Sequence, residues 1–165
     1  ILSKWKSLYA PWSLINEKFD VQNLLEEIHH LVTDSKEDRN FTVHLNTTKK
    51  GPIIEGDREK LRQVILNIVK NSIEALPDGG VMSLGVEERV DSIEITVKDQ
   101  GHGIPEKLQK KIFNPYFTTK KDGTGLGLCV SRRIIEEHEG SSFNIESEEG
   151  KGTTVKISLA RNLPD

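Results

Sequence analysis

Two glycine-rich segments, close together in the sequence, constrain the fold of this chain most strongly. They read Asp99-Gln-Gly-His-Gly-Ile104 and Gly123-Thr-Gly-Leu-Gly-Leu128. The first follows an alternating apolar stretch and opens with a carboxylate, which can accept a hydrogen bond from a flat polar ring that lies against bare backbone. The second leads into a helical pattern, and a glycine loop at the start of a helix presents free N–H groups to phosphate. Together the two segments predict a nucleotide-binding site.

Length and composition narrow the class of protein. The 165 residues suit one domain with a substantial core, and the net charge of −3 is spread along the chain. No basic block indicates a nucleic-acid partner, and no apolar run approaches the roughly 20 residues needed to cross a bilayer. The single cysteine, Cys129, excludes an internal disulfide framework and favours a reducing, cytoplasmic setting. Because the chain opens with Ile1, we expect it to be part of a longer protein.

The hydrophobic periodicity predicts alternating helices and hairpin-linked strands. We therefore expect an α/β (α+β) two-layer sandwich, in which a mixed, mostly antiparallel sheet of about five strands carries three main helices on one face. Residues 1–20 lack this pattern and are predicted to be a linker to another part of the protein, whereas residues 21–165 form the domain. The first predicted helix begins at Asp20, and three more span about 57–76, 105–113 and 125–138. The predicted strands cover about 41–45, 53–54, 82–86, 93–97, 143–145 and 155–159.

The predicted helix from Asp57 to Leu76 carries two asparagines one turn apart on its polar side, Asn67 and Asn71. A solvated helix face is the simplest explanation for them. Asparagine is nevertheless a poor helix former, and an amide oxygen is a hard ligand that suits Mg²⁺ held together with phosphates. Next to the glycine segments, these residues favour a metal–nucleotide site.

Five motifs follow one another along the chain. They are Asn67-Ile-Val-Lys-Asn71-Ser-Ile-Glu-Ala, Asp99-Gln-Gly-His-Gly-Ile104, Phe113-Asn-Pro-Tyr-Phe-Thr-Thr-Lys120, Gly123-Thr-Gly-Leu-Gly-Leu128 and Gly150-Lys-Gly-Thr-Thr154. In this order and spacing they resemble the ATP-binding catalytic domain of sensor histidine kinases, within the superfamily shared with gyrase, Hsp90 and MutL. The short segment Tyr116-Phe-Thr-Thr-Lys-Lys-Asp-Gly is most similar to the compact lids of nitrogen-regulation and sporulation-type kinases. The resemblance covers about residues 20–160 and implies that residues 1–20 include the end of a dimerisation helix.

The resemblance implies a role for each matching position. Asp99 would accept the adenine amino group, with Thr153 supporting it, and Asn71 would bind Mg²⁺ while Asn67 lies near the phosphates. Either Lys120 or Lys121 would neutralise the γ-phosphate, a role weighed equally against a solvated lid lysine. Phe113 and Phe117 would anchor the lid by packing. Catalytic roles are implied for Asn67, Asn71 and Lys120; the remaining candidates for contact with ATP are Gly101, Gly103, Ile104, Thr119, Lys121, Gly123, Thr124, Gly125, Leu126, Gly127 and Leu128.

The acceptor of the phosphoryl group is expected outside this chain. Related hydrolases place a glutamate at the position of Asn67 as a base, and an amide cannot act as one, which favours transfer to a histidine. His29 and His30 lack the acidic neighbour and proline of an acceptor motif, and His102 is expected to point outward. The implied partners are a histidine-bearing dimerisation domain of the same kinase, through which it forms a homodimer, and a response regulator. A protein inhibitor as a further partner and a membrane anchor elsewhere in the parent protein are left open. The alternative functions are a nucleotide-dependent interaction module and a gyrase-like ATPase.

Overall fold

A five-stranded mixed sheet forms one layer of the molecule. The computed structural model describes residues 13–35, 39–48 and 50–161, and within them the strand order of this sheet is β2-β4-β5-β7-β6. The edge strand β2 runs parallel to β4, and every other neighbouring pair is antiparallel. The prediction of a mixed, mostly antiparallel sheet is confirmed. The strands are β2 (Phe41–Asn46), β4 (Gly80–Glu88), β5 (Ser92–Asp99), β6 (Ser142–Glu148) and β7 (Gly152–Ala160).

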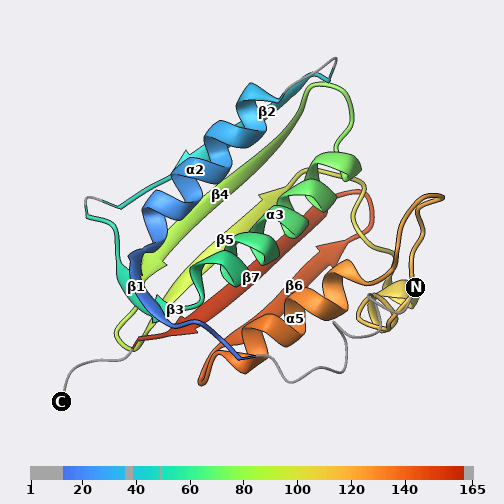
Figure 1. Ribbon diagram of the computed structural model, residues 1–165. Helices are drawn as coiled ribbons and strands as arrows, with labels where there is room; N and C mark the ends of the chain where they lie inside the picture. Colours follow the sequence, from blue (N-terminus) through green and yellow to red (C-terminus); the bar gives the residue numbers. More distant parts are fainter. Residues whose placement is uncertain (1–12, 36–38, 49, 162–165) are drawn as a thin grey trace.

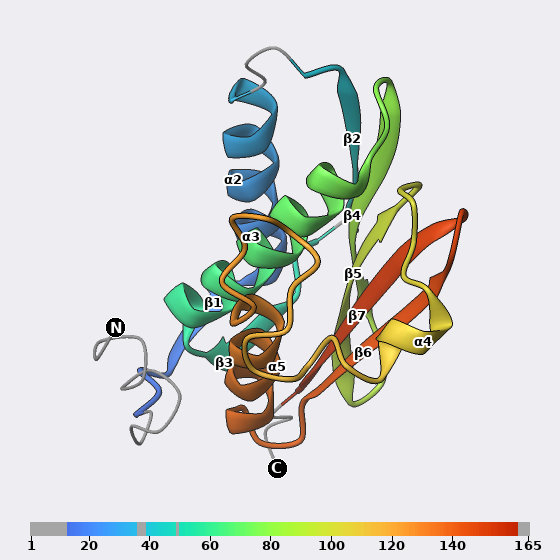
Figure 2. The same ribbon diagram turned by 90° about the vertical axis from the view of Figure 1, so that its right-hand side faces the viewer.

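Three helices form the second layer: α2 (Val21–Asp34), α3 (Arg58–Ala75) and α5 (Gly127–Glu137). All three cover the same face of the sheet, and the side view shows the helices on one side and the bare strands on the other (Figures 1 and 2). Alternation explains this arrangement, because every second residue of the central strands is buried beneath the helices. The buried strand residues include Met82, Leu84 and Val86 on β4, Ile93, Ile95 and Val97 on β5, and Val155, Ile157 and Leu159 on β7.

Two aspartates start the first two helices. Asp20 caps α2 by accepting hydrogen bonds from the N–H groups of Gln22 and Asn23, and Asp57 caps α3 by accepting from that of Lys60. Helix α3 ends before Pro77, as predicted, because proline cannot continue the hydrogen-bond ladder. The apolar arc of α3 is buried against the sheet. Its opposite side is therefore left for the polar residues of the site.

A separate two-stranded sheet joins the start of the described chain to the start of α3. Strand β1 (Glu17–Asp20) pairs antiparallel with β3 (Ile53–Gly56). Residues 17–20, which the sequence analysis gave to the linker, are thus a strand packed on the domain, with Phe19 buried. The expectation for residues 1–12 lies outside the described residues.

Two helix boundaries differ from the sequence prediction. The segment predicted to be helical from 105 to 113 is α-helical only over α4 (Glu106–Gln109) and continues as turns. The helix predicted from Gly125 begins at Gly127, because Gly125 has a φ of 68°, a left-handed conformation outside the α-helix. These two loops flank the short segment that resembles a lid.

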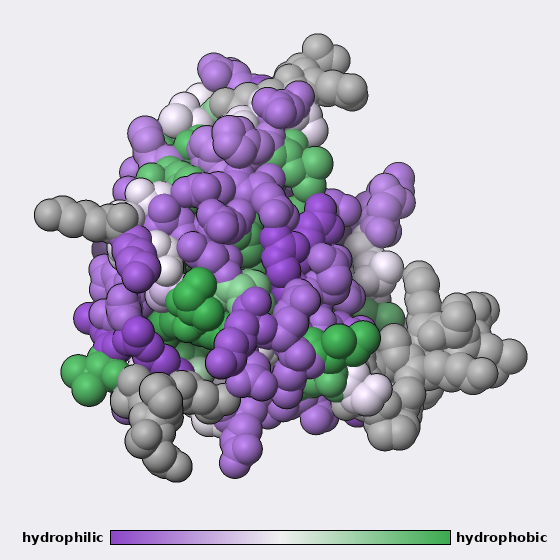
Figure 3. All heavy atoms as spheres, turned by 60° about the vertical axis from the view of Figure 1, so that its left-hand side comes forward, coloured by the Kyte–Doolittle hydropathy of each residue, from purple (hydrophilic) through white to green (hydrophobic). Residues whose placement is uncertain are grey.

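One face of the molecule is predominantly hydrophilic. On the face shown in Figure 3, hydrophilic residues cover most of the area and apolar residues form separate small patches. Over the described residues, none of the helices combines the length and apolar character that crossing a membrane requires.

Candidate nucleotide-binding site

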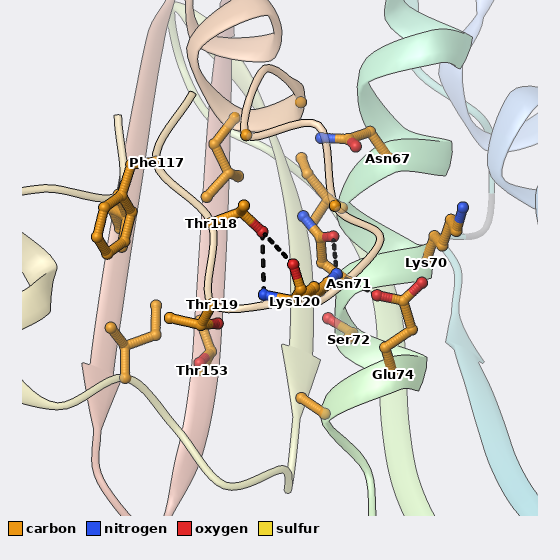
Figure 4. Close-up of a pocket in the computed structure, with 18 of the residues that line it drawn as sticks. Asn67, Lys70, Asn71, Ser72, Glu74, Phe117, Thr118, Thr119, Lys120 and Thr153 are labelled. Carbon is orange, nitrogen blue, oxygen red and sulfur yellow. Dashed lines mark hydrogen bonds and ion pairs between the residues drawn. The ribbon is translucent and has the colours of Figure 1, made fainter. Parts of the chain in front are cut away.

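A cavity of about 800 Å³ lies between α3, the ends of β5 and β7, and the segment 117–125. Figure 4 shows that this segment crosses in front of the polar side of α3. Of the residues proposed from the sequence to contact ATP, all line the cavity except Gly101 and Leu126. The lining includes Asn67, Asn71, Asp99, Gly103, Ile104, Thr119, Lys120, Lys121, Gly123, Thr124, Gly125, Gly127, Leu128 and Thr153.

Asp99 ends strand β5 at the floor of the cavity and is only 4% exposed. Its Oδ1 accepts a hydrogen bond from the N–H of Gly101 at 2.8 Å. Gly101 is held close, since a Cβ there would lie 2.8 Å from the Ala75 carbonyl oxygen, at the end of α3. The turn therefore packs bare backbone beside a buried carboxylate, as a flat polar ring requires.

The turn is fixed on its other side by the loop between β6 and β7. Gly103 adopts a φ of 68°, and a Cβ there would come within 2.0 Å of the Glu148 carbonyl oxygen. Ser147 Oγ accepts the N–H of Ile104 at 2.8 Å and lies 2.8 Å from Thr153 Oγ1. Thr153 in turn pairs with Asp99 across β5 and β7. Ser147 thus connects the glycine turn to the threonine that the sequence analysis placed beside Asp99.

Asn67 and Asn71 both face the cavity from α3, but they have different partners. Asn67 Nδ2 donates to Ser131 Oγ on α5 at 3.1 Å, whereas Asn71 Oδ1 accepts from Lys120 Nζ at 2.8 Å. Gly127 is required opposite Asn67, because a Cβ there would lie 2.5 Å from Asn67 Oδ1. The two asparagines therefore hold α5 and the lid, respectively, against α3.

Lys120 also forms an ion pair with Glu74, one turn further along α3 than Asn71 (Figure 4). A compact turn holds its backbone, in which the Lys120 N–H donates to Thr118 Oγ1 at 3.0 Å and the Gly123 N–H donates to the Lys120 carbonyl at 3.2 Å. The segment 117–125 is called the lid from here on. In this structure the lid is closed onto α3 through its lysine.

The glycine segment 123–128 joins the end of the lid to the first turn of α5. Gly125, the last residue of the lid, passes so close to Tyr116, just before the lid, that a Cβ at 125 would lie 2.3 Å from the Tyr116 carbonyl carbon. Tyr116 itself has a φ of 66°. The N–H of Leu126 donates to Thr124 Oγ1 at 3.3 Å. This N–H, which the sequence analysis assigned to phosphate, is therefore engaged within the loop. Gly127 and Leu128, at the helix start, face the cavity.

An aromatic contact fixes the segment that precedes the lid. The rings of Phe113 and Phe143 meet edge to face at 5.9 Å, and the Arg132 guanidinium lies 4.8 Å from the centre of the Phe113 ring. Phe113 therefore packs on β6 and α5, while Phe117 lines the cavity instead.

Sequence reasoning missed several residues of the site. Ser147 and Ser131 hold predicted site residues in place, and their sequence context carries no signal for it. His102, expected to point outward, is exposed, but it also borders the cavity, and its Nδ1 lies 2.7 Å from the Gly103 carbonyl oxygen. The apolar walls were also missed; they come from Ile68, Leu108, Ile112, Ile145 and Val155.

Cys129, in the first turn of α5, is a thiol without features of a nucleophile. Its Sγ donates to the Leu126 carbonyl oxygen at 3.1 Å. Burial raises the pKa of this thiol above its ordinary 9.0, which keeps it protonated near neutral pH.

Comparison with known proteins agrees with this geometry. Residues 56–163 match the family described as "Histidine kinase-, DNA gyrase B-, and HSP90-like ATPase". Sporulation kinase A of Bacillus subtilis is 37% identical over 162 residues, which are 98% of this chain and 27% of the kinase. The sensor histidine kinase ZraS of Escherichia coli is 35% identical over 163 residues, 99% of this chain and 35% of ZraS. The chain thus spans about a quarter to a third of the length of these two relatives.

The solved structures include a relative matched over nearly its full length. The catalytic domain of the histidine kinase ThkA superposes with a TM-score of 0.80 at 32% identity, covering 89% of this chain and 98% of that domain. ThkA in complex with the response regulator protein TrrA superposes with a TM-score of 0.82 at 27% identity, covering 98% of this chain and 46% of that one. The chain belongs to the histidine kinase-, DNA gyrase B- and HSP90-like ATPase family, and within it to the histidine kinase catalytic domains.

Proposed function

We propose that this domain binds Mg²⁺–ATP in the cavity between α3 and the lid and donates the γ-phosphoryl group to a histidine on a separate dimerisation domain. The observation that carries the proposal is the pairing, in one cavity, of a buried carboxylate beside bare backbone with an amide oxygen on α3. The family supplies ATP as the nucleotide.

Adenine is assigned to the end of the cavity floored by Asp99. A buried carboxylate accepts a hydrogen bond strongly, and adenine presents an exocyclic amino group as donor. Gly101 packs its backbone against the end of α3 and donates its N–H to the carboxylate, which orients Asp99. Thr153 lies across the strand pair from Asp99. The apolar walls, such as Ile68 and Val155, suit the faces of a purine.

The phosphates are assigned to the opposite end, between Asn71, the lid and the start of α5. Asn71 Oδ1 already accepts a bond from a cationic group in this structure, the Lys120 ammonium, so the residues present fit a cation at this point. An amide oxygen is a hard donor of the kind Mg²⁺ takes. When bound, Mg²⁺ supplies neutralisation of the phosphate oxygens. Gly127 and Leu128 present the amino end of α5 to the same region.

We propose that the acceptor histidine lies outside this chain. His102 lines the cavity, but its Nδ1 lies 2.7 Å from the Gly103 carbonyl oxygen, within its own turn. His138 is buried with both ring nitrogens bonded, to the Asp57 N–H and the Ile134 carbonyl, and His29 is bonded to the Val43 carbonyl. In the proposed transfer, the γ-phosphorus–oxygen bond breaks as a phosphorus–nitrogen bond forms to an imidazole brought by another domain, and ADP leaves. The domain's part is to position the nucleotide and neutralise its charge.

The wider setting is proposed from the relatives. ThkA has been solved with the response regulator protein TrrA, and we propose a response regulator as the partner that receives the phosphoryl group here too. We propose a cytoplasmic location and a homodimer formed through the dimerisation domain. An ATPase activity is disfavoured by Asn67, because its amide is bonded to Ser131 and cannot take a proton from water.

The test mixes this chain with the purified dimerisation domain of its own kinase and ATP labelled on the γ-phosphate. Acid-labile label on the dimerisation domain, dependent on Mg²⁺, is the expected result. Steady release of inorganic phosphate without labelling would instead identify an ATPase. Nucleotide binding with neither outcome would leave an interaction module. The Asp99→Asn variant, expected to bind the nucleotide more weakly, serves as the control and should give less label.

A further inference from the structure

Lys120 Nζ lies between the side-chain oxygens of two residues of α3. It donates to Asn71 Oδ1 at 2.8 Å and pairs with the carboxylate of Glu74. Because residues three apart on a helix lie on the same side, both oxygens approach the ammonium from one surface. Figure 4 shows Lys120 of the lid reaching to both side chains, whereas Lys70 of α3 points away from Lys120.

Glu74 places a negative charge at the proposed phosphate end of the cavity. Among the described residues, Lys120 is the cation paired with it. A carboxylate beside a polyphosphate raises the free energy of binding unless a cation lies between them. This position therefore needs a positive charge both before and after the nucleotide binds.

We infer that Asn71 and Glu74 form a single cation site, which holds the Lys120 ammonium in the closed lid and takes the divalent ion when the nucleotide binds. The inference rests on the proposed function and adds a ligand to the metal site, Glu74, together with an exchange between the metal and the lid. An amide oxygen and a carboxylate form a hard oxygen donor set that suits Mg²⁺. The ammonium is the stand-in for that ion in the closed form.

The exchange releases the lid lysine at the moment when the phosphates arrive. The side chains of Lys120 and Glu74 are 45% and 33% exposed, so their ion pair is readily exchanged. The backbone turn of the lid is held separately, by the bond from Lys120 N–H to Thr118 Oγ1. Lys120 can therefore leave α3 while its turn stays intact, and its ammonium then faces the cavity.

The first test removes the charge of Glu74 and keeps its shape. The affinity of ADP for the chain is measured by calorimetry in excess Mg²⁺ and in EDTA, for the wild type, Glu74→Gln and the control Glu59→Gln on the first turn of α3. We expect Glu74→Gln to weaken ADP binding in Mg²⁺ by about tenfold, as the loss of a group that tunes a metal typically does. ADP binding in EDTA should stay equal or tighten, and Glu59→Gln should behave as the wild type.

The second test removes the competing ammonium. ADP lacks the γ-phosphate, so Lys120 is assayed here without its proposed contact to that group. We expect Lys120→Met to increase the gain in ADP affinity on adding Mg²⁺ by about twofold to fivefold, since an exposed ion pair contributes little. Lys110→Met, on the exposed turn after α4, is the matched control and should leave the gain unchanged.

The results separate this inference from the proposed function. If Glu74→Gln binds ADP in Mg²⁺ as tightly as the wild type or more tightly, or if Lys120→Met reduces the gain from Mg²⁺, the inference is wrong. In either case, wild-type binding that depends on Mg²⁺ and is lost in Asn71→Ala would leave the proposed function standing. A wild type whose ADP binding is indifferent to Mg²⁺ would refute the magnesium assignment itself. Thermal unfolding of every variant verifies that it is folded.

Discussion

Asn67 donates a hydrogen bond to the buried hydroxyl of Ser131, and this contact joins helix α3 to helix α5 directly beside the cavity. One helix carries the proposed metal ligand and the other begins with the glycine loop. The contact therefore sets the separation of the two helices that would hold the phosphates. The contact also engages the side-chain amide of Asn67. This is the position at which, by the resemblance, related hydrolases carry a glutamate as a base.

Ser131→Ala tests the link between the helices. Since the variant leaves the Asn67 amide without its partner, the free energy of unfolding should fall by about 0.5–1.5 kcal/mol. Nucleotide affinity should fall with it, because the start of α5 is no longer held. Urea denaturation and calorimetry measure the two effects, with Ser142→Ala on the exposed edge strand β6 as the control. Unchanged affinity together with lost stability would restrict Ser131 to a structural role.

Asp99→Asn tests recognition of the base. The amide oxygen of the introduced asparagine can still accept the Gly101 N–H, so the turn should keep its shape. Loss of a charged hydrogen-bond acceptor should weaken adenine nucleotide binding by more than about tenfold. Glu94→Gln, on the same strand but the opposite face of the sheet, should bind as the wild type does in calorimetry. Near wild-type affinity of Asp99→Asn would contradict the adenine assignment.

A pair of glycine variants tests the close approach at the first turn. Gly103 and Gly150 both have left-handed φ angles, 68° and 81°, but a Cβ at 103 would meet the Glu148 carbonyl at 2.0 Å whereas one at 150 meets nothing within 4 Å. Gly150→Ala should cost only the conformational strain, about 1–2 kcal/mol. Gly103→Ala should unfold at clearly lower denaturant and bind nucleotide more weakly. Equal losses in the two variants would mean that the loop moves aside.

The single cysteine provides a test of burial by pH. Because burial raises the pKa of the Cys129 thiol above its ordinary 9.0, the reactive thiolate is scarce below that pH and grows only as pH rises through the raised value. Alkylation by iodoacetamide, followed by mass spectrometry, should be slow in the folded chain and become faster in urea at the same pH. Alkylation at equal rates in folded and unfolded chains would show that the thiol is freely accessible.

Periodicity in the sequence was sufficient to predict the layers. The alternation through Ile93, Ile95 and Val97 predicted a strand ending at Asp99, and the two asparagines predicted on one side of α3 both line the cavity. The glycines were informative for another reason. Where two backbone segments approach closely there is no space for a Cβ, so glycine in the sequence marks such positions.

Contacts between distant segments could not be read in the same way. The pairing of β1 with β3 joins two four-residue strands, too short to carry a clear alternating pattern. Ser147 and Ser131 hold the site through single hydroxyl groups, which any serine in a loop or helix carries. The contact of Lys120 with Asn71 and Glu74 depends on how the lid folds back across α3, and no local rule of sequence determines that path.

Asp57 has a wider consequence than capping one helix. Its side chain accepts hydrogen bonds from the N–H groups of Lys60 and Ile15, and its own N–H donates to His138 at the end of α5. Three parts of the molecule thus meet at one residue: the segment just before β1, the helix that carries Asn67 and Asn71, and the helix that follows the glycine loop. A displacement of the segment before β1 would therefore act on both helices at the ends that lie far from the cavity.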